Sequence, residues 1–400
     1  MIGDNLEPYI AGAENTGYTS ALMLTGVTSW DRLTNSNVSP DFQQGLARRW
    51  RLTPRERVVA ALNREKPDRI PKALGFFPQS LPAIGNTAPE DHFHLDVGFV
   101  EFNPPTDQDR FLDYLDRLPA DIHVGNYTQL QTYHEWDYHP EHKGLGPLES
   151  IQSIEELADH VFPDLTHPSR YRGLTAEVAG WHSKGLAVAG APPHLGGQLF
   201  ETACRLRGFN TFLRDMLVNR KLAHYLLDQL TAIMIHNSLI LARSGIDILL
   251  LDDDVASPGQ LMISPDMWRE YYKPRLADAI RIAREEAPEL LVFYHCDGNF
   301  TRLLPDLVEI GVNVVNPVQP DCMDAAAIKQ EFGDRLSLWG TVGTATLWDY
   351  GTPRQIRAEV RRRIDTLGPA GLLMAPAYDI DFTPVENLRA FAEAVEEGYP

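Results

Sequence analysis

From residue 151 to the C-terminus, short apolar runs alternate with longer amphipathic segments. A short continuous apolar run is typical of a strand buried on both faces, and strands that alternate with helices form right-handed βαβ units in a parallel sheet. The expected strands are 186–191, 247–252, 290–295, 312–316, 336–340 and 371–376; the expected helices are two within 208–242, then 265–286, 301–310, 324–332, 353–367 and 384–397. With further strands near 70–77, 95–102 and 121–124, the pattern predicts an α/β fold, a distorted (β/α)8 TIM barrel rather than an open sheet.

A well-marked helix is expected near the start of this barrel. Thr53 suits the N-cap, Pro54 the first turn, and Glu56 the third helical position of a capping box. We therefore assign residues 49–400 to the barrel domain. Residues 78–150 are rich in Pro, Gly, His and aromatic residues, and long loops with a helix near 107–117 are expected there.

Composition limits the partners. The formal net charge of −19 argues against nucleic acid or an anionic membrane, because both require a basic surface. Three cysteines without a CxxC pair make no disulfide framework, and no apolar run approaches the roughly 20 residues that cross a bilayer. We expect a cytoplasmic protein.

Polar residues follow almost every expected strand. They are His194, Asp252, Asp253, Asp254, His295, Asp297, Asn316, Gln319, Tyr378 and Asp379. The carboxyl ends of parallel strands meet at one pole of a barrel, so these side chains are expected to gather there. Carboxylates, imidazoles and amides without a basic cluster suit either metal binding or acid–base work on a neutral or cationic group.

His295 and Asp297 form the strongest pair, because residues i and i+2 of an extended strand point the same way. Of Asp252, Asp253 and Asp254 we expect only one to face the pocket, and a turn or helix-cap role is open for all three. Cys322 is either a metal ligand or a small core residue.

Two His-containing runs, Asp91–His94 and His134–His142, match no standard metal-site spacing and are typical of loops.

From about residue 52 onward the chain resembles the uroporphyrinogen decarboxylase superfamily, which includes cobalamin-dependent methyltransferases. The matching stretches are Thr53–Asn63, Pro67–Pro71, Asp252–Asp254, Ser264–Glu270 with Pro274, His295–Asn299, Ile310–Asn313, Asn316–Pro320 and Thr383–Asn387. The resemblance implies a distorted TIM barrel, in agreement with the strand pattern.

The chain departs from two branches of that superfamily. A uroporphyrinogen decarboxylase grips its substrate through an Arg-rich motif, whereas the matching stretch Gly75–Ser80 has no Arg. Thiol-methylating members bind zinc through a His-x-Cys pair and a later Cys. This chain has His295-x-Asp297, and Tyr378 stands at the later position, which is a harder ligand set.

The resemblance therefore implies a methyltransferase on the substrate side. It would demethylate a small methoxylated or methylamine-type donor and pass the methyl group to the cobalt of a corrinoid (cobalamin-type) partner protein. His295, Asp297 and Tyr378 are the expected catalytic residues. Substrate binding is assigned to His194, Asp252, Asp253, Asp254, Asn316 and Gln319. Zn²⁺ or another divalent metal would be held by His295, Asp297 and Cys322.

Two other functions stay open. One is a cofactor-independent decarboxylase, a carbon–carbon lyase acting on a small acid, which needs basic residues in the pocket; Arg302 and Lys329 are the candidates. The other is a barrel without catalysis that binds a small molecule or a corrinoid. The oligomeric state is also open, with a homodimer as one option.

The first residues do not fit this barrel. Residues 1–45 resemble the C-terminal piece of a haloacid dehalogenase-type phosphatase, on Gly3–Leu6, Ala11–Ala13, Leu24–Thr28 and Pro40–Asp41. In that family the acid matching Asp4 helps to hold Mg²⁺, but Tyr9 replaces a second Asp. The nucleophile of such an enzyme would lie upstream of this piece. We expect residues 1–48 to be a non-catalytic appendage, from a gene fusion or a misplaced start codon.

Overall fold

The computed structural model describes residues 52–74, 81–85, 87–103, 146–160, 162, 164–380 and 382–398. Its contacts divide the chain between Leu52 and Thr53, and Thr53–Pro400 is one compact unit. The expected elements at 107–117 and 121–124, the stretch Gly75–Ser80 and the run His134–His142 lie outside the described residues. Within the described part of the chain, no helix is both long and apolar enough to cross a membrane.

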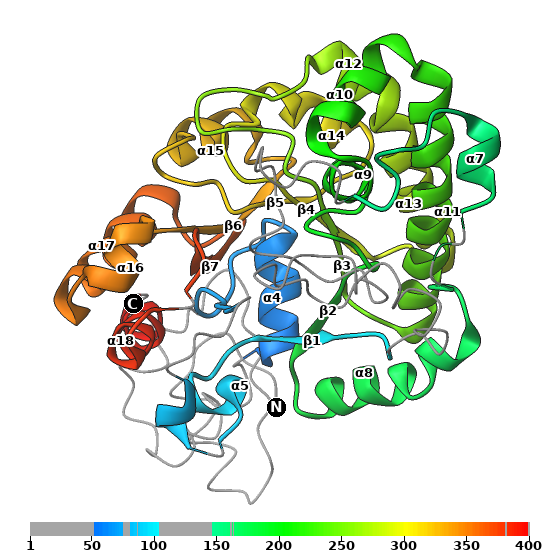
Figure 1. Cartoon of the computed structure of the whole chain (residues 1–400). Coiled ribbons are helices and arrows are strands. Elements are labelled where there is room, and N and C mark those ends of the chain that lie inside the picture. The colour runs from blue at the N-terminus through cyan, green and yellow to red at the C-terminus, as the bar shows by residue number, and fades with distance from the viewer. Residues whose placement is uncertain are drawn as a thin grey trace, which may run out of the picture. The chain divides into compact units, whose positions relative to one another are not determined.

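A parallel sheet of seven strands in sequential order forms the centre of the described unit and curls around helix α4 (Figure 1). The strands are β1 (Val97–Val100), β2 (Ala187–Gly190), β3 (Ile248–Asp252), β4 (Leu291–His295), β5 (Val314–Asn316), β6 (Ser337–Val342) and β7 (Leu372–Pro376). Sequential order with parallel pairing is the order of a barrel of βα units. The expected α/β architecture with a curled parallel sheet is confirmed.

A short segment that contains Lys72 and Ala73, called the Lys72 segment below, lies between the first and last strands of the sheet, β1 and β7. Lys72 forms a parallel bridge with Met374 of β7, and the amide of Ala73 donates to the Met374 carbonyl (3.1 Å). On its other side, the amide of Asp96 donates to the Lys72 carbonyl (3.0 Å), one residue before β1 begins. Backbone hydrogen bonds thus run from β7 through this segment to β1.

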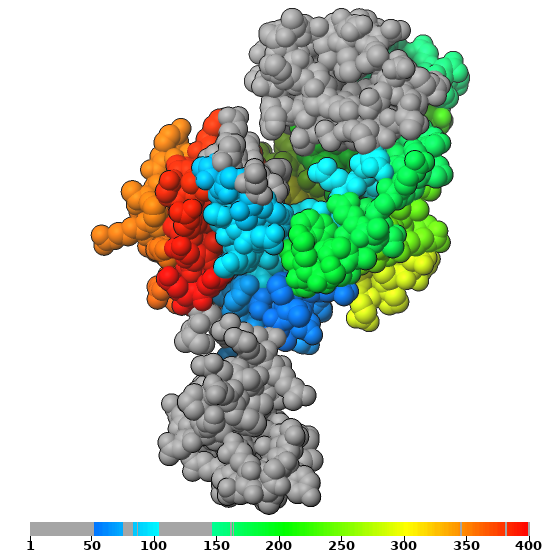
Figure 2. Space-filling view, turned by 90° about the horizontal axis from the view of Figure 1, so that it is seen from below, coloured from blue at the N-terminus to red at the C-terminus, as the bar shows by residue number. Residues whose placement is uncertain are grey.

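Helices surround the sheet. They are α4 (Pro54–Leu62), α5 (Pro89–His92), α7 (Ile154–Ala158), α8 (Leu174–Ser183), α9 (Phe200–Arg207), α10 (Phe209–Val218), α11 (Arg220–Ser244), α12 (Pro265–Tyr271), α13 (Lys273–Glu286), α14 (Leu304–Glu309), α15 (Ala325–Phe332), α16 (Ala345–Tyr350), α17 (Pro353–Leu367) and α18 (Val385–Glu397), with 3-10 turns at Leu81–Ile84, Pro168–Tyr171 and Thr301–Leu303. In Figure 2 the cyan segment around α5 lies between red α18 and green α8, as it does in Figure 1.

Helix α4 covers the amino ends of the strands. Thr53 and Glu56 form the expected capping box. The carbonyl of Ala61 accepts from the Gly371 amide (2.8 Å), and the carbonyl of Leu62 accepts from the Ser337 hydroxyl (2.8 Å), each at the start of a strand. Because α4 occupies this end, the carboxyl ends of the strands form the opposite pole, where the polar residues lie.

The apolar residues sort into two clusters by strand alternation. The inner cluster joins α4 to the inward side chains of the strands: Val58, Leu62, Ala73, Val97, Ala187, Ala189, Ile248, Leu291, Phe293, Val314, Trp339, Leu373 and Ala375. The larger cluster packs the outward side chains against the helices. Burial on both faces explains why the strands read as continuous apolar runs.

The observed elements match the expected ones with specific exceptions. The helix expected at 265–286 is two helices, because the chain breaks at Tyr272 just before Pro274, whose ring does not fit a helix interior. The amphipathic pattern did not reveal α8, α9 or α16. Near 70–77, the described residues hold only the bridge at Lys72 rather than a strand.

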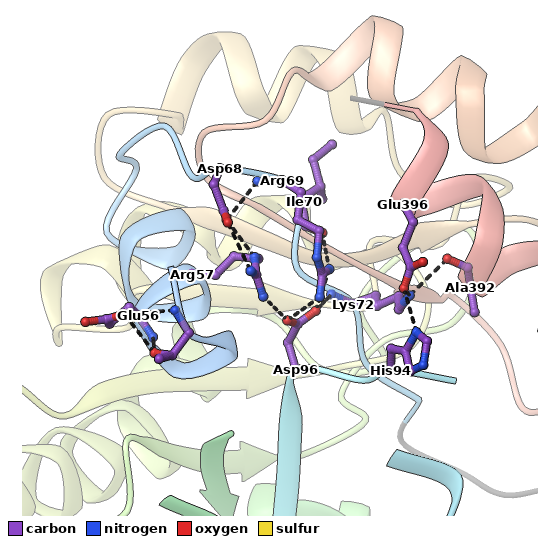
Figure 3. Close-up of polar contacts among 11 residues, drawn as sticks. Glu56, Arg57, Asp68, Arg69, Ile70, Lys72, His94, Asp96, Ala392 and Glu396 are labelled. Atoms are coloured by element: carbon purple, nitrogen blue, oxygen red, sulfur yellow. Dashed lines mark hydrogen bonds and ion pairs between the residues drawn. The ribbon is translucent and has the colours of Figure 1, made fainter. Parts of the chain in front are cut away.

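A buried charged network ties the Lys72 segment to its neighbours (Figure 3). The fully buried Asp96 carboxylate accepts from Arg57 (2.6 Å), from Arg69 (2.8 and 2.9 Å) and from the Lys72 amide (2.9 Å). The buried Lys72 ammonium donates to Glu396 (2.6 Å) and to a carbonyl of α18 (3.0 Å). One carboxylate thus links α4, the segment before the bridge and the start of β1.

Deletion of residues 1–48 is expected to leave the melting temperature and the activity of the protein nearly unchanged. The reason is that the compact unit begins at Thr53, with its own helix cap. Thermal melts of the full and shortened chains, followed by circular dichroism, measure this. A collapsed melt of the shortened chain would contradict the assignment of residues 1–48 as an appendage.

Candidate functional site at the carboxyl ends of the strands

Three polar side chains stand in one layer because of the sheet register. Asp252 pairs with His295, and His295 pairs with Asn316, at the ends of β3, β4 and β5. Each lies two residues after an inward apolar residue, namely Leu250, Phe293 and Val314. Strand alternation therefore turns all three side chains to the inner side of the curled sheet, at the carboxyl ends of its strands.

Asn316 fixes the tautomer of His295. The Asn316 amide nitrogen donates to the Trp339 carbonyl (2.9 Å), so its oxygen is the atom that faces the imidazole. That oxygen lies 2.5 Å from Nδ1 of His295, which therefore carries a proton. Nε2 points to the acids and lies 3.7 Å from Asp254 and 3.7 Å from Asp297.

The acids keep His295 protonated. Burial alone lowers the pKa of His295, but the carboxylates of Asp252, Asp297 and Asp254 outweigh burial and raise the pKa to about 10. Burial raises the pKa of Asp297 to about 6, against the opposing effect of the imidazolium. The site therefore holds a cationic imidazole among carboxyl groups, and burial raises the pKa of one of them, Asp252, well above its usual range.

The three consecutive acids take three different roles. Asp252 faces inward, and its buried Oδ1 makes no hydrogen bond within the described part of the chain. The Asp253 carboxylate turns outward and accepts from the amides of Leu199 (3.1 Å) and Glu201 (3.2 Å), at the start of α9. Asp254 returns to the site and accepts from the Asp297 amide (2.5 Å). Two acids face the pocket, rather than the expected one, and the Asp253 carboxylate caps the start of α9.

A buried pair on α9 lies directly behind these acids. Glu201 accepts from the Asp254 amide (3.3 Å) and pairs with Arg205 at 3.4 Å. Burial and the neighbouring Asp254 raise the pKa of Glu201 to about 8. His194 adjoins the same region, and burial together with the charge of His295 lowers its pKa to about 4, so the imidazole is neutral. Sequence reasoning missed Glu201 because α9 itself was not recognised.

Gln319, Cys322 and Tyr378 form a second group next to Asp297. The Gln319 side chain accepts from the Gly298 amide (2.8 Å) and lies 3.5 Å from the Cys322 sulfur. The Tyr378 hydroxyl donates to Asp321 (3.1 Å), and burial with that acid raises the pKa of the phenol. Cys322 also lines an open hollow of about 560 Å³, which is lined as well by Glu359 and Arg363 of α17.

One set of side chains in the described part of the chain fits a metal ion. Ligand atoms of Asp252, Asp254 and His295 lie within 4.8 Å of one another. The ligand set expected from the sequence was His295, Asp297 and Cys322, and of these only His295 belongs to the group. The Cys322 thiol instead faces Gln319, and burial raises its pKa, which disfavours a thiolate ligand.

The basic residues considered for a decarboxylase lie elsewhere. Arg302 is exposed in the turn that precedes α14. Lys329 is on α15, and its ammonium donates to the Gly371 carbonyl (3.2 Å), which precedes β7 at the amino end of the strands. Neither reaches the site, so the cations that a lyase of small acids needs are not supplied by these two residues.

Similarity to known proteins agrees with this geometry. The chain is 28% identical over 203 residues to a methylated-thiol–coenzyme M methyltransferase of Methanosarcina mazei, covering 50% of this chain and 51% of that protein. It is 27% identical over 201 residues to the methylcobamide:CoM methyltransferase MtaA of Methanosarcina barkeri, covering 49% and 55%. A uroporphyrinogen decarboxylase of Xanthomonas axonopodis pv. citri is 31% identical over 191 residues, covering 44% and 50%. The chain thus spans about half the length of these curated relatives.

A solved methyltransferase structure from Methanosarcina mazei superposes with a TM-score of 0.59 at 20% identity, over 87% of this chain and 100% of that one, which supports the TIM-barrel-like fold. Residues 1–44 match a HAD-hydrolase-like model, as the resemblance of that segment indicated. Residues 174–398, more than half of the chain, match the uroporphyrinogen decarboxylase (URO-D) model. The chain belongs to the uroporphyrinogen decarboxylase family, as its strand-end motifs predicted.

Proposed function

We propose that this protein is a corrinoid-dependent methyltransferase, which moves a methyl group from a small methoxylated or methylamine-type donor to the cobalt of a corrinoid protein. The observation that carries the proposal is His295, a protonated imidazole held among Asp252, Asp254 and Asp297 at the open pole of the sheet. Family membership and the two similar methyltransferases support it. We further propose that the Lys72 segment takes the place of an eighth strand and closes the barrel.

The reaction requires positive charge on the atom that the methyl group leaves. A methyl group on an ether or a neutral amine is a poor electrophile until its heteroatom is protonated or bound by a Lewis acid. His295 is placed to supply a proton through Nε2, because Asn316 holds Nδ1 and the acids stabilise the imidazolium. Asp297 lies 3.7 Å from Nε2 of His295, and Tyr378 belongs to the second group, which adjoins Asp297. The corrinoid supplies the nucleophilic cobalt that accepts the methyl group.

The same residues fit a divalent cation. Two carboxylates and an imidazole form a donor set suited to Zn²⁺ or a similar ion, and the unpaired Oδ1 of Asp252 is a free ligand atom. The hydrogen bond from Nδ1 to Asn316 orients the ring as metal-bound histidines require. A metal held here would polarise the leaving heteroatom in place of the proton, because Nδ1 of His295 is bonded to Asn316 and Nε2 cannot carry a proton and bind a metal at once.

Elemental analysis tests the metal. If the site binds Zn²⁺, we expect one ion per chain in the wild-type protein and none in the Asp254→Asn variant. A Cys322→Ala variant should keep the ion, because Cys322 does not belong to the group. Loss of metal from Cys322→Ala together with retention in Asp254→Asn would contradict these ligands.

The proposed function is tested with cob(I)alamin and purified protein. Methoxyaromatic compounds and methylamines are offered in turn, and the visible spectrum reports conversion to methylcobalamin. We expect conversion with at least one donor class, at a rate proportional to protein concentration. Turnover of a small acid with release of CO₂ in the absence of a corrinoid, and no conversion with any donor, would point to a lyase instead.

A further inference from the structure

The connection that follows β5 is anchored on β6. The Thr341 amide donates to the Pro317 carbonyl (2.9 Å), and the Asn316 side chain donates to the Trp339 carbonyl (2.9 Å). Gly340 lies between these two β6 residues, and a Cβ at this position would come within 2.5 Å of the Pro317 carbonyl oxygen. The close approach of the two backbones therefore requires glycine, and it holds the start of the connection against the strand.

The rest of this connection is fixed as well. Val318 is fully buried and has φ = +54°, a left-handed conformation that is unusual for a β-branched residue. Such conformations persist only where the surrounding structure imposes them, and they cluster at functional sites. The carbonyl of the next residue, Gln319, accepts from the amides of Cys322 and Met323 (both 2.9 Å). The direction in which the Gln319 side chain leaves the backbone is thus set by the fold.

The Gln319 side chain crosses from this connection to the end of β4. It is buried, and its amide oxygen accepts from the amide of Gly298, the residue directly after Asp297 (2.8 Å). Because the oxygen is used there, the amide nitrogen is the atom that serves Asp297, and it acts as a hydrogen-bond donor to the Asp297 carboxylate. One side chain therefore contacts both the Asp297 carboxylate and the backbone next to it.

Asp297 needs such a contact to keep its place in the site. Its side chain is 48% exposed, and its carboxylate lies 3.7 Å from Nε2 of His295, which is beyond hydrogen-bond distance. Asp254 accepts from the backbone amide of Asp297 (2.5 Å), and so fixes the backbone rather than the carboxylate. Ordering a half-exposed side chain costs rotamer entropy, which a hydrogen bond to the carboxylate offsets. Gln319 supplies that hydrogen bond.

We propose that the segment Asn316–Gln319 is a positioning clamp for His295 and Asp297, in which Gln319 is the positioning residue that holds the Asp297 carboxylate beside Nε2 of His295. This inference rests on the proposed function. Asn316 binds the imidazole at Nδ1, and Gln319 binds the segment that carries the acid, so neutral amides of one connection orient both groups. The sequence assigned Gln319 to the substrate, whereas in the clamp it acts through Asp297.

Replacement of Gln319 by Met keeps the length of the side chain and removes its hydrogen bonds. In the cob(I)alamin assay we expect kcat to fall about 10- to 100-fold, because a displaced reacting group loses its productive geometry, while KM for the methyl donor changes less than about twofold. Gln330→Met, the same change at an exposed position of α15, is the matched control and should keep both constants. A wild-type kcat for Gln319→Met, or a loss in KM alone as for a substrate ligand, would overturn the clamp.

The nitrogen-15 resonances of the His295 imidazole give a readout that does not depend on activity. The His295→Ala protein assigns them by their absence, and all samples are compared at equal metal content. We expect Gln319→Met to shift the Nε2 resonance and to leave Nδ1 unchanged, because Asn316 still holds Nδ1. Asn316→Ala should instead shift Nδ1. If Gln319→Met shifts both resonances and lowers the melting temperature, its role is only structural and the inference fails.

The two readouts separate this inference from the proposed function. If the wild-type protein transfers a methyl group from no donor, the proposed function fails, and a selective shift of Nε2 in Gln319→Met still supports the clamp. If the wild type transfers a methyl group and Gln319→Met matches it in kcat and in both resonances, the proposed function stands and the clamp fails.

Discussion

Replacement of His295 by Ala is expected to lower the rate of methyl transfer by at least about 100-fold, which is the usual contribution of a general acid. The imidazole is the central contact of the site: it bonds to Asn316 and faces Asp254 and Asp297. Without it, the carboxylates face one another with no cation between them. Initial rates of methylcobalamin formation at saturating donor measure the effect.

The matched control for this variant is His94→Ala. His94 is 73% exposed and pairs with Glu396 at 3.3 Å, beside the network of Figure 3 rather than at the strand ends. We expect its rate to equal that of the wild type. Both variants should keep the wild-type circular dichroism spectrum. An active His295→Ala protein would remove His295 from the mechanism.

Replacement of Asp96 by Ala is expected to destabilise the protein by about 3–5 kcal/mol, the usual consequence of breaking a buried ion pair by removing one partner. Asp96 is fully buried and accepts from Arg57, from Arg69 and from the Lys72 amide. Its loss removes one of the two carboxylates that pair with the buried Arg57, the other being Asp68, and takes the acceptor from the Lys72 amide. Urea denaturation followed by tryptophan fluorescence measures the free energy of unfolding.

Glu286→Ala is the control for this second variant. Glu286 pairs with Arg243 at 3.0 Å, but both side chains are largely exposed. Exposed pairs contribute about 0–1 kcal/mol, so this change should be nearly neutral. Equal stability of the Asp96→Ala and wild-type proteins would mean that the network does not hold the Lys72 segment in place.

The strand ends were predictable because their signal is local. The run Leu290–Tyr294 is long enough to specify a buried strand, and His295 follows at once. Parallel pairing then brings the ends of neighbouring strands together without further information. The register that aligns Asp252, His295 and Asn316 is a consequence of that pairing.

The direction of each acid after β3 was not predictable in the same way. Asp253 faces outward because the start of α9 offers amides to its carboxylate, and α9 has no amphipathic pattern to reveal it. All eight residues of α9 are buried, including Glu201 and Arg205. A helix that is buried on all sides and carries charged residues has no apolar stripe in its sequence, so the sequence alone suggests an irregular segment.

Cys322 shows a second limit of predicting the site from the sequence. It follows β5 by several residues, inside a turn that precedes α15, and the direction of a turn side chain is set by tertiary contacts rather than by strand alternation. The sequence placed it near the pole of the barrel but did not fix its distance from His295. The structure groups it with Gln319 and Tyr378 instead.

The most direct test of the central claim follows the methyl group itself. A donor with an isotopically labelled methyl group is incubated with the protein and cob(I)alamin, and nuclear magnetic resonance detects the label bound to cobalt. We predict labelled methylcobalamin and an equal amount of demethylated donor with the wild type and His94→Ala, and neither product with His295→Ala. Label that stays on the donor with every protein, or that reaches cobalt equally well without His295, would contradict the account.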